Sequence, residues 1–145
     1  MIDDYSRVAR VKVLEDKKVL TVMFDALKAF NMLKHQYNIE IDAVMTDNGA
    51  EFGNGRLSRN KQNHPFERLL LEMQMKHIYT KPYRPQTNGK IERFWKTLNE
   101  DFICDALYEN IEDKKNELMG FLIYYNEYRY NSAIKRMTPK EKLNM

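Results

Sequence analysis

Segments of strand character alternate with amphipathic helical segments along this chain, and no other feature limits its possible folds as much. Apolar residues recur at three- and four-residue spacing over 17–37, the pattern of one face of an α-helix. A short apolar run over 39–45 follows it, and a helical pattern over 66–75 precedes a second short run over 77–80. This order predicts an α/β fold, in which helices cover the faces of a sheet.

The remaining segments extend the same order of elements. They are predicted strands over 2–6 and 8–13, predicted helices over 88–107 and 112–130, and a last short helix beginning at Thr138-Pro139. In the first of these helices, a stripe of apolar residues is expected to face the core: Ile91, Trp95, Leu98 and Phe102. Residues 48–65 are rich in Gly, Asn and Ser, so we expect an exposed and mobile loop there.

The composition fits one globular domain. A chain of 145 residues, 43% hydrophobic and 31% charged, is large enough for one core, so residues 1–145 are expected to form a single domain. Cys104 is the only cysteine, which excludes an internal disulfide and fits a reducing compartment. The three histidines show no metal-ligand spacing and receive no role. Without an apolar leader or an apolar run of spanning length, the sequence predicts a cytoplasmic protein with no membrane partner.

Positive charge is concentrated in the middle of the chain. Residues 53–93 hold nine Lys and Arg side chains against three acids, although the net charge of the whole chain is only +3. A local basic excess is typical of a surface that binds phosphate groups. A solvated basic face without a partner explains it equally well.

Two short motifs place one acid at the end of a predicted strand and another near the start of a predicted helix. Asp47 follows the apolar run over 39–45, and Glu92 lies four residues into the helix that Asn88 is expected to cap. Carboxylates beyond the carboxyl end of a strand are suited to Mg²⁺, and two such ions about 4 Å apart can clamp the oxygens of a phosphodiester. Alternatively, Asp47 only starts a turn with Asn48, and Glu92 is an ordinary helix-surface acid.

Three segments taken together resemble one known family. They are TDNGAEF over 46–52, KPYRPQTNGKIERFWKTL over 81–98 and YYNEYRYNSAIKRMTPKEKL over 124–143, and they look like the integrase-like catalytic core of bacterial insertion-sequence transposases, relatives of retroviral integrases. IDDYSR over 2–7 is similar to the second strand of that family. The resemblance implies a ribonuclease H-like mixed sheet flanked by helices. It also implies an Asp-Asp-Glu triad that holds two Mg²⁺ or Mn²⁺ ions and cuts and joins DNA strands.

The resemblance assigns roles to individual positions. Asp47 matches the second acid of the triad and Glu92 the third, so both are expected to be catalytic and to bind metal close to each other. Five further residues are expected to bind DNA: Asn48, Arg84, Lys90, Arg93 and Lys96. In the loop over 48–65, basic residues are expected to order against DNA: Arg56, Arg59 and Lys61.

The first acid of the triad has no match in this sequence. In the family it lies on a strand ahead of the IDDYSR-like strand, and this central strand is therefore expected to be missing, which would make the core domain incomplete at the N-terminus. Asp3 and Asp4 match acids of the second strand, and their expected role is structural. The alternative is that either one replaces the missing first acid of the triad. Whether the chain is an enzyme stays open at this point.

Two classes of function remain. In the first, the chain is part of a metal-dependent polynucleotidyl transferase that joins transposon ends to target DNA, inactive as this fragment and assembled as a dimer or larger oligomer on double-stranded DNA. In the second, it is a non-catalytic DNA-binding remnant of an insertion sequence. A ribonuclease H-like nuclease is a weaker alternative, because a fold does not fix a reaction.

Overall fold

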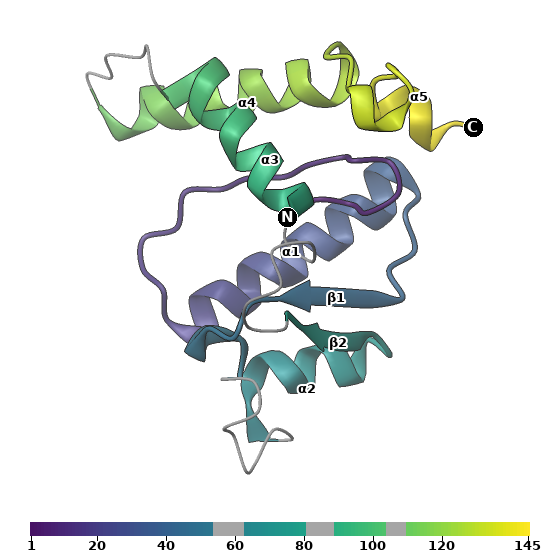
Figure 1. Ribbon diagram of the computed structural model, residues 1–145. Coiled ribbons are helices and arrows are strands. Elements are labelled where there is room, and N and C mark those ends of the chain that lie inside the picture. The colour runs from purple at the N-terminus through teal and green to yellow at the C-terminus, as the bar shows by residue number, and fades with distance from the viewer. Residues whose placement is uncertain (54–62, 81–88, 104–109) are drawn as a thin grey trace. The chain divides into compact units, whose positions relative to one another are not determined.

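The computed structural model describes residues 1–53, 63–80, 89–103 and 110–145 (Figure 1). The chain divides into two compact units. We call Leu14–Thr87 the strand unit, and Met1–Val13 together with Asn88–Met145 the helical unit. Among the described residues, no helix is both long and apolar enough to cross a membrane.

The strand unit contains the predicted alternation of helices and strands. Its elements in chain order are α1 (Val19–Tyr37), β1 (Ala43–Thr46), the 3-10 turn η1 (Ala50–Phe52), α2 (Pro65–Glu72) and β2 (Lys76–Tyr79). The two strands are parallel, with Ala43 opposite Lys76 and Thr46 opposite Tyr79. The helix predicted over 17–37 is confirmed, whereas β1 is shorter than the strand predicted over 39–45.

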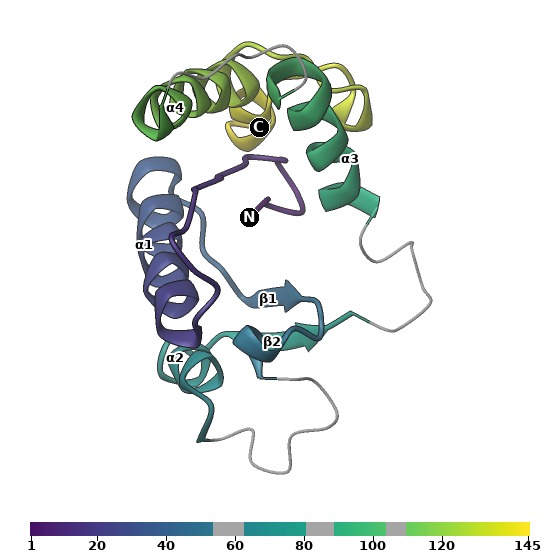
Figure 2. The same ribbon diagram turned by 90° about the vertical axis from the view of Figure 1, so that its left-hand side faces the viewer.

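Helix packing forms the interior of the strand unit. The buried side chains of α1 recur at helical spacing: Ala26, Ala29, Phe30 and Leu33. Helix α2 contacts α1 and buries Phe66 and Leu70, and the two helices lie next to each other in Figure 2. Phe66 meets Phe52 edge to face, with ring centroids 5.1 Å apart. Burial of each large side chain stabilises the unit by about 1.5–3 kcal/mol.

The helical unit consists of helices and turns in its described parts. They are α3 (Gly89–Leu98), the π-helical turn η5 (Asn99–Ile103), α4 (Ile111–Glu127), the 3-10 turn η6 (Ser132–Ile134) and α5 (Pro139–Leu143). Asn110 caps α4 by accepting the N–H of Asp113. A capping box between Thr138 and Glu141 starts α5, as the Thr-Pro sequence predicts. The predicted helices over 112–130 and from Thr138 are therefore confirmed, with slightly different ends.

The core of the helical unit corrects one prediction about α3. Phe94 and Leu98 are buried on this helix, but Trp95 is 46% exposed and does not face the core as predicted. The reason is that Phe94 packs edge to face on the buried Tyr125 of α4, with centroids 5.0 Å apart. Phe102 packs partly buried against the same cluster, so the apolar face of the helix passes through Phe94 in place of Trp95.

The N-terminal residues correct a second prediction. The two strands predicted over 2–6 and 8–13 are reduced to one antiparallel bridge between Ile2 and Ala9. Arg7 adopts a left-handed backbone with φ of 69°, which closes a tight turn. Both backbone polar groups of Ala9 bond to the buried side chain of Asn126, at 2.8 and 2.9 Å. A side chain therefore occupies the groups that a neighbouring strand would need.

Candidate active site

Asp47 begins the turn that leaves the carboxyl end of β1. Its side chain is exposed, and its Oδ1 accepts the backbone N–H of Gly49 at 3.0 Å. Thr46 donates its hydroxyl to the Asp47 carbonyl at 2.9 Å. Side-chain bonds to the neighbouring backbone are typical of a turn that begins at Asp. Asp47 therefore starts a turn, as the alternative interpretation of the sequence expected. These bonds also orient the carboxylate, and no partner of its second oxygen is found among the described residues.

Hydrogen bonds connect the turn after β1 to the residue that follows β2. Asn48 donates its amide to the Thr80 carbonyl at 3.1 Å, and the Thr80 N–H donates to the Thr46 carbonyl at 2.9 Å. Thr80 is itself buried. The two bonds extend the parallel pairing by one residue beyond the named strands, so the position of Asp47 depends on both strands.

A partly buried polar cluster lies next to the same strand end. The His77 ring contacts Thr46 and Glu67, with Nε2 2.8 Å from Thr46 Oγ1 and Nδ1 3.1 Å from Glu67 Oε1. The His77 side chain is 6% exposed and that of Glu67 15%. Tyr79 places its hydroxyl 2.6 Å from Glu67 Oε1 and 2.7 Å from the Phe52 carbonyl. We call these four residues, Thr46, Glu67, His77 and Tyr79, the polar cluster.

Gly53 packs so close to the polar cluster that there is no space for a side chain at this position. Its φ of 111° lies in the left-handed region, and an added Cβ would stand 2.6 Å from the Tyr79 hydroxyl oxygen. A side chain at this position would therefore be strained and would also displace Tyr79. The end of η1 is thus matched to the cluster that supports β1.

Glu92 occupies a different setting. It lies in the first turn of α3, on the exposed side of a helix whose other side carries the buried Phe94 and Leu98. Lys96 follows one turn later and pairs with Glu100 at 3.6 Å. A carboxylate near a helix N-terminus is favoured by the helix dipole. Packing of α3 therefore fixes the backbone of Glu92, while the Glu92 side chain makes no bond among the described residues.

The structure assigns the predicted site residues to both units. Asp47 and Asn48 belong to the strand unit, whereas Glu92 and Lys96 belong to the helical unit. The close approach of Asp47 to Glu92 therefore stays a prediction. In the helical unit Lys90 pairs with Asp4, and Arg93 is exposed.

Several predicted residues lie outside the described ranges. They are Arg84, the expected cap Asn88 and the loop cations Arg56, Arg59 and Lys61. Their expected contacts with DNA therefore stay predictions, as does the mobility of the loop. In the described parts of the chain, no group of three or more His, Cys, Asp or Glu side chains could hold a metal ion.

Asp3 and Asp4 are engaged in local bonds. Asp3 Oδ2 accepts both the N–H and the hydroxyl of Ser6, each at 2.7 Å, and so holds the turn before Arg7. Asp4 pairs with Arg7 at 3.5 Å and also with Lys90. This geometry supports the structural role expected for the two acids.

Residues 73–139 match the family model of the integrase core domain, and this region includes β2, α3 and Glu92. The protein described as integrase ORF3 of a Spiroplasma virus is 32% identical over 149 residues, which cover 99% of this chain and 40% of that protein. The transposase for insertion sequence element IS904 of Lactococcus lactis subsp. lactis is 25% identical over 99 residues, 68% of this chain and 36% of that protein. The chain is a homologue of integrases and insertion-sequence transposases. This confirms the resemblance stated from the motifs.

Two solved structures resemble this integrase homologue. The catalytic core domain of BIV integrase aligns with a TM-score of 0.69 and 20% identity, over 97% of this chain and 80% of that one. A chain of the simian T-cell lymphotropic virus intasome aligns with a TM-score of 0.74 and 18% identity, over 99% of this chain and 46% of that one. At these identities the likeness establishes the fold, a mixed α/β fold like that of retroviral integrase catalytic cores. The homologue spans 40% or less of the length of the two relatives above.

The polar cluster of this integrase homologue has little signal in the sequence. The histidines have no ligand spacing, so no role was expected for His77. The one available signal is that His77 and Tyr79 alternate along a short strand and therefore share a face. Their partner Glu67 comes from a helix, and only the folded chain brings it to that face.

Proposed function

We propose that this chain forms the DNA-transfer core of a transposase or integrase, with Asp47 and Glu92 as two acids of its metal-binding triad. The observation that carries the proposal is the position of each acid on its element. Asp47 directly follows the carboxyl end of a parallel strand, and Glu92 lies in the first turn of α3, within the residues that match the integrase core domain. Both positions correspond to those that the motifs predict.

The two side chains have the chemistry that a divalent cation requires. Both carboxylates are exposed, and the structure shows no basic partner for either among the described residues. Oxygen ligands of this kind suit Mg²⁺ and Mn²⁺. A bound pair of such ions would activate the attacking oxygen and stabilise the leaving oxygen of a phosphodiester. The Gly49 N–H donates to the Asp47 carboxylate and so restricts its orientation.

The basic side chains of α3 would hold the DNA backbone. We assign phosphate contacts to Lys90, Arg93 and Lys96, together with Arg84 and Asn48. Because phosphate contacts carry no sequence information, duplex binding by this chain should be weak, independent of sequence and strongly dependent on salt. The substrates would be transposon ends and target DNA.

Two acids alone would not bridge two metal ions. We propose that residues 1–145 form one ribonuclease H-like core domain whose mixed sheet is completed by a further strand carrying the first acid. One of the similar structures is named an intasome, and joining two DNA ends requires both to be held together. We therefore infer that the active form is a homodimer or a larger assembly on DNA.

A strand-transfer assay with pre-cut transposon ends and Mn²⁺ tests this function. The 145-residue chain should join no strands, because two acids cannot bridge both ions, whereas a version with an Asp-bearing strand joined ahead of Met1 should be active. Glu92→Gln and Asp47→Asn should each abolish that activity, and Arg68→Ala, on α2, is the matched control.

Other outcomes would redirect the proposal. Joining by the 145-residue chain that is lost in Asp3→Asn or Asp4→Asn would identify the missing acid. DNA binding without joining in the extended version would favour a non-catalytic DNA-binding remnant. Hydrolysis of an RNA–DNA hybrid without strand joining would favour a nuclease.

A further inference from the structure

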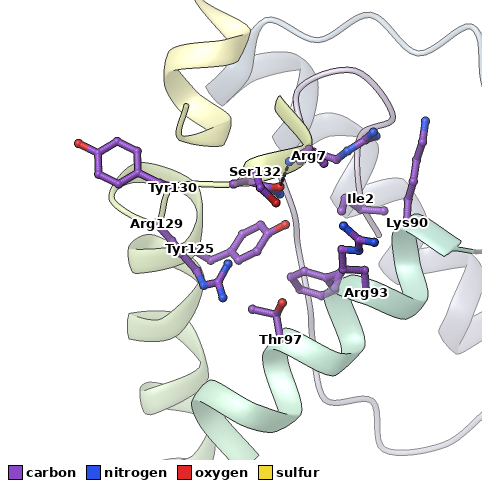
Figure 3. A pocket seen from close by; sticks show the side chains of 12 residues that line it. Ile2, Arg7, Lys90, Arg93, Thr97, Tyr125, Arg129, Tyr130 and Ser132 are labelled. Atoms are coloured by element: carbon purple, nitrogen blue, oxygen red, sulfur yellow. Dashed lines mark hydrogen bonds between the residues drawn. The ribbon is translucent and has the colours of Figure 1, made fainter. Parts of the chain in front are cut away.

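Partly buried charged side chains occur in a pocket of the helical unit and in the polar cluster of the strand unit. The pocket has a volume of about 360 Å³, and Figure 3 shows the basic side chains that line it. Arg7 pairs with Asp4 at 3.5 Å. Arg129 pairs with Asp101 at 2.9 Å. The least exposed cations of the pocket thus already have acidic partners, whereas the polar cluster connects its charged groups to a candidate catalytic acid.

The polar cluster forms a row of contacts that runs from α2 to the turn after β1. Glu67 Oε1 lies 3.1 Å from His77 Nδ1, and His77 Nε2 lies 2.8 Å from Thr46 Oγ1. The Thr46 hydroxyl donates to the Asp47 carbonyl at 2.9 Å. This carbonyl belongs to the peptide that joins Asp47 to Asn48, so its direction sets the path of the turn. The row of contacts therefore ends at the backbone of the proposed metal-binding acid.

The number of protons determines which group donates in each contact. A hydroxyl has one proton to donate, and a carbonyl oxygen only accepts. Because the Thr46 proton goes to the Asp47 carbonyl, the Thr46 oxygen accepts a proton from His77 Nε2. On the other side of the ring, the Glu67 carboxylate attracts Nδ1 only when Nδ1 is protonated as well. A cationic His77 ring therefore satisfies both contacts at once.

A neutral His77 ring would reverse one of these bonds. The remaining proton should stay on Nδ1, because a hydrogen bond to a carboxylate is stronger than one to a hydroxyl. Nε2 would then accept the Thr46 proton, and the Asp47 carbonyl would lose its donor. Loss of one proton from the ring should therefore loosen the Asp47 turn without any change in packing.

Packing keeps the His77 ring in the orientation that these bonds require. Its side chain is 6% exposed, and its ring centroid lies 4.1 Å from that of Tyr79 and 5.5 Å from that of Phe66. The Tyr79 hydroxyl is 2.6 Å from Glu67 Oε1 and so restrains the carboxylate. Lys76, the other charged residue of β2, is exposed.

The elements that pack against β2 leave Glu67 as the counter-ion of His77. Strand β1 contains no titratable side chain. On α2, Arg68 and Glu72 are exposed and pair with each other at 3.8 Å. Glu51 of η1 lies beside the turn that follows β1.

We propose that His77 is a positioning residue, whose cationic ring holds the Asp47 turn through an Nε2–H bond to the Thr46 hydroxyl. This inference rests on the proposed function, because Asp47 is the acid assigned there to metal binding. Residues that orient a metal ligand from outside the metal site typically contribute about 10–100-fold to metal affinity or activity.

NMR of the ¹⁵N-labelled 145-residue chain tests the bond to Thr46. Ring signals follow each His77 nitrogen as the pH is raised, and the Gly49 amide reports on the turn because it donates to Asp47 Oδ1. His77 should lose its proton from Nε2, and the Gly49 amide should shift with the same midpoint. The exposed His35 is the internal control, and Gly49 should not follow its titration.

Two variants of Thr46 test the link between the ring and the turn. Thr46→Ser keeps the hydroxyl and should preserve the coupled shift of Gly49. Thr46→Val has a similar shape without the hydroxyl and should abolish the coupling, although His77 still titrates. The proposal would be overturned by proton loss from Nδ1, by a Gly49 amide that does not follow His77, or by equal responses of the two variants.

Mn²⁺ binding measures the consequence for the metal site. The ion broadens NMR signals near it, so a titration below the midpoint of His77 gives its affinity at the Asp47 turn. His77→Phe should weaken this affinity about tenfold. His77→Gln, whose amide can donate to Thr46, should restore most of the affinity, and Lys76→Ala is the control.

The two proposals fail in distinguishable ways. Equal weakening by His77→Phe and His77→Gln would show that His77 only fills space, and it would overturn the positioning role. Absence of Mn²⁺ binding at Asp47 in the unchanged chain would count against the proposed function, while the coupled titration of His77 and Gly49 would still decide the role of His77.

Discussion

The two candidate catalytic acids are supported in different ways. Asp47 lies on a turn that hydrogen bonds fix to the ends of two strands, next to the polar cluster. Glu92 stands on a helix that is fixed by apolar contacts of its opposite side, through Phe94 and Leu98. One acid is therefore positioned by directional polar bonds and the other by burial.

This difference predicts different sensitivities. Hydrogen bonds demand particular donors and acceptors at particular distances, so conservative changes in the polar cluster should disturb the Asp47 turn. Apolar packing responds mainly to volume and tolerates swaps of similar size. The Asp47 turn should therefore be sensitive to chemistry, and α3 to the size of its buried side chains.

The largest effect is expected from Phe94→Ala in the helical unit. Removing a buried aromatic side chain should lower the free energy of unfolding by about 3–5 kcal/mol. The half-exposed neighbour Trp95 provides the control, and Trp95→Ala should cost about 1 kcal/mol or less. Urea denaturation followed by circular dichroism gives both values. Equal losses would show that the apolar face of α3 is not the one described.

The next largest effect is expected from His77→Ala in the strand unit. It removes the ring that contacts Glu67 and Thr46, while Glu67 keeps Tyr79 and Thr46 keeps the Asp47 carbonyl, and this loss should cost about 1–3 kcal/mol. The adjacent exposed residue gives the control variant Lys76→Ala. Hydrogen exchange at β1 should accelerate while that at α4 stays unchanged. Acceleration of both would contradict independent support of the two acids.

A smaller effect is expected for DNA binding through α3. Lys96→Ala should reduce the slope of log affinity against log salt by about one unit, as expected for one lost phosphate contact. Lys34→Ala, which removes an exposed lysine near the end of α1, is the control. Fluorescence anisotropy with duplexes of two unrelated sequences measures the slope. An equal change in both variants would assign the effect to overall charge.

The smallest effect concerns pH and the buried Tyr125 hydroxyl. Burial raises the pKa of Tyr125 above its ordinary value of 10.0, against the opposing fields of Arg129 and Arg7. The folded chain then keeps a proton that the unfolded chain loses above about pH 10, so stability should fall as the pH rises past this value. Urea midpoints of the wild type and of Tyr125→Phe isolate the effect. A wild-type midpoint that falls no faster than that of Tyr125→Phe would contradict it.

Much of the secondary structure followed from local patterns. The helix over Val19–Tyr37 has an apolar stripe, and Thr138-Pro139 is a strong helix start, so both were predictable. The N-terminal strands were not, because alternating residues cannot reveal that Asn126, 117 positions away, bonds to the backbone of Ala9. The face of α3 was misjudged for a similar reason, since Tyr125 selects Phe94 over Trp95.

The residues of the candidate site also differ in whether local sequence could predict them. The motifs predict Asp47 and Glu92 as site residues because acids at a strand end and a helix start are local features. They did not identify His77 or Glu67, whose roles arise from contacts between β1, β2 and α2.

The sequence by itself determined most of the helices and the resemblance to integrases, and it predicted the two acids, since periodicity, turn residues and short motifs act over neighbouring positions. The tertiary structure alone decided which backbone groups of the N-terminal segment pair with a side chain, how the Asp47 turn is supported and where a basic pocket forms beside Tyr125. Burial and hydrogen bonding between distant segments depend on how those segments pack, and local sequence does not encode that packing position by position.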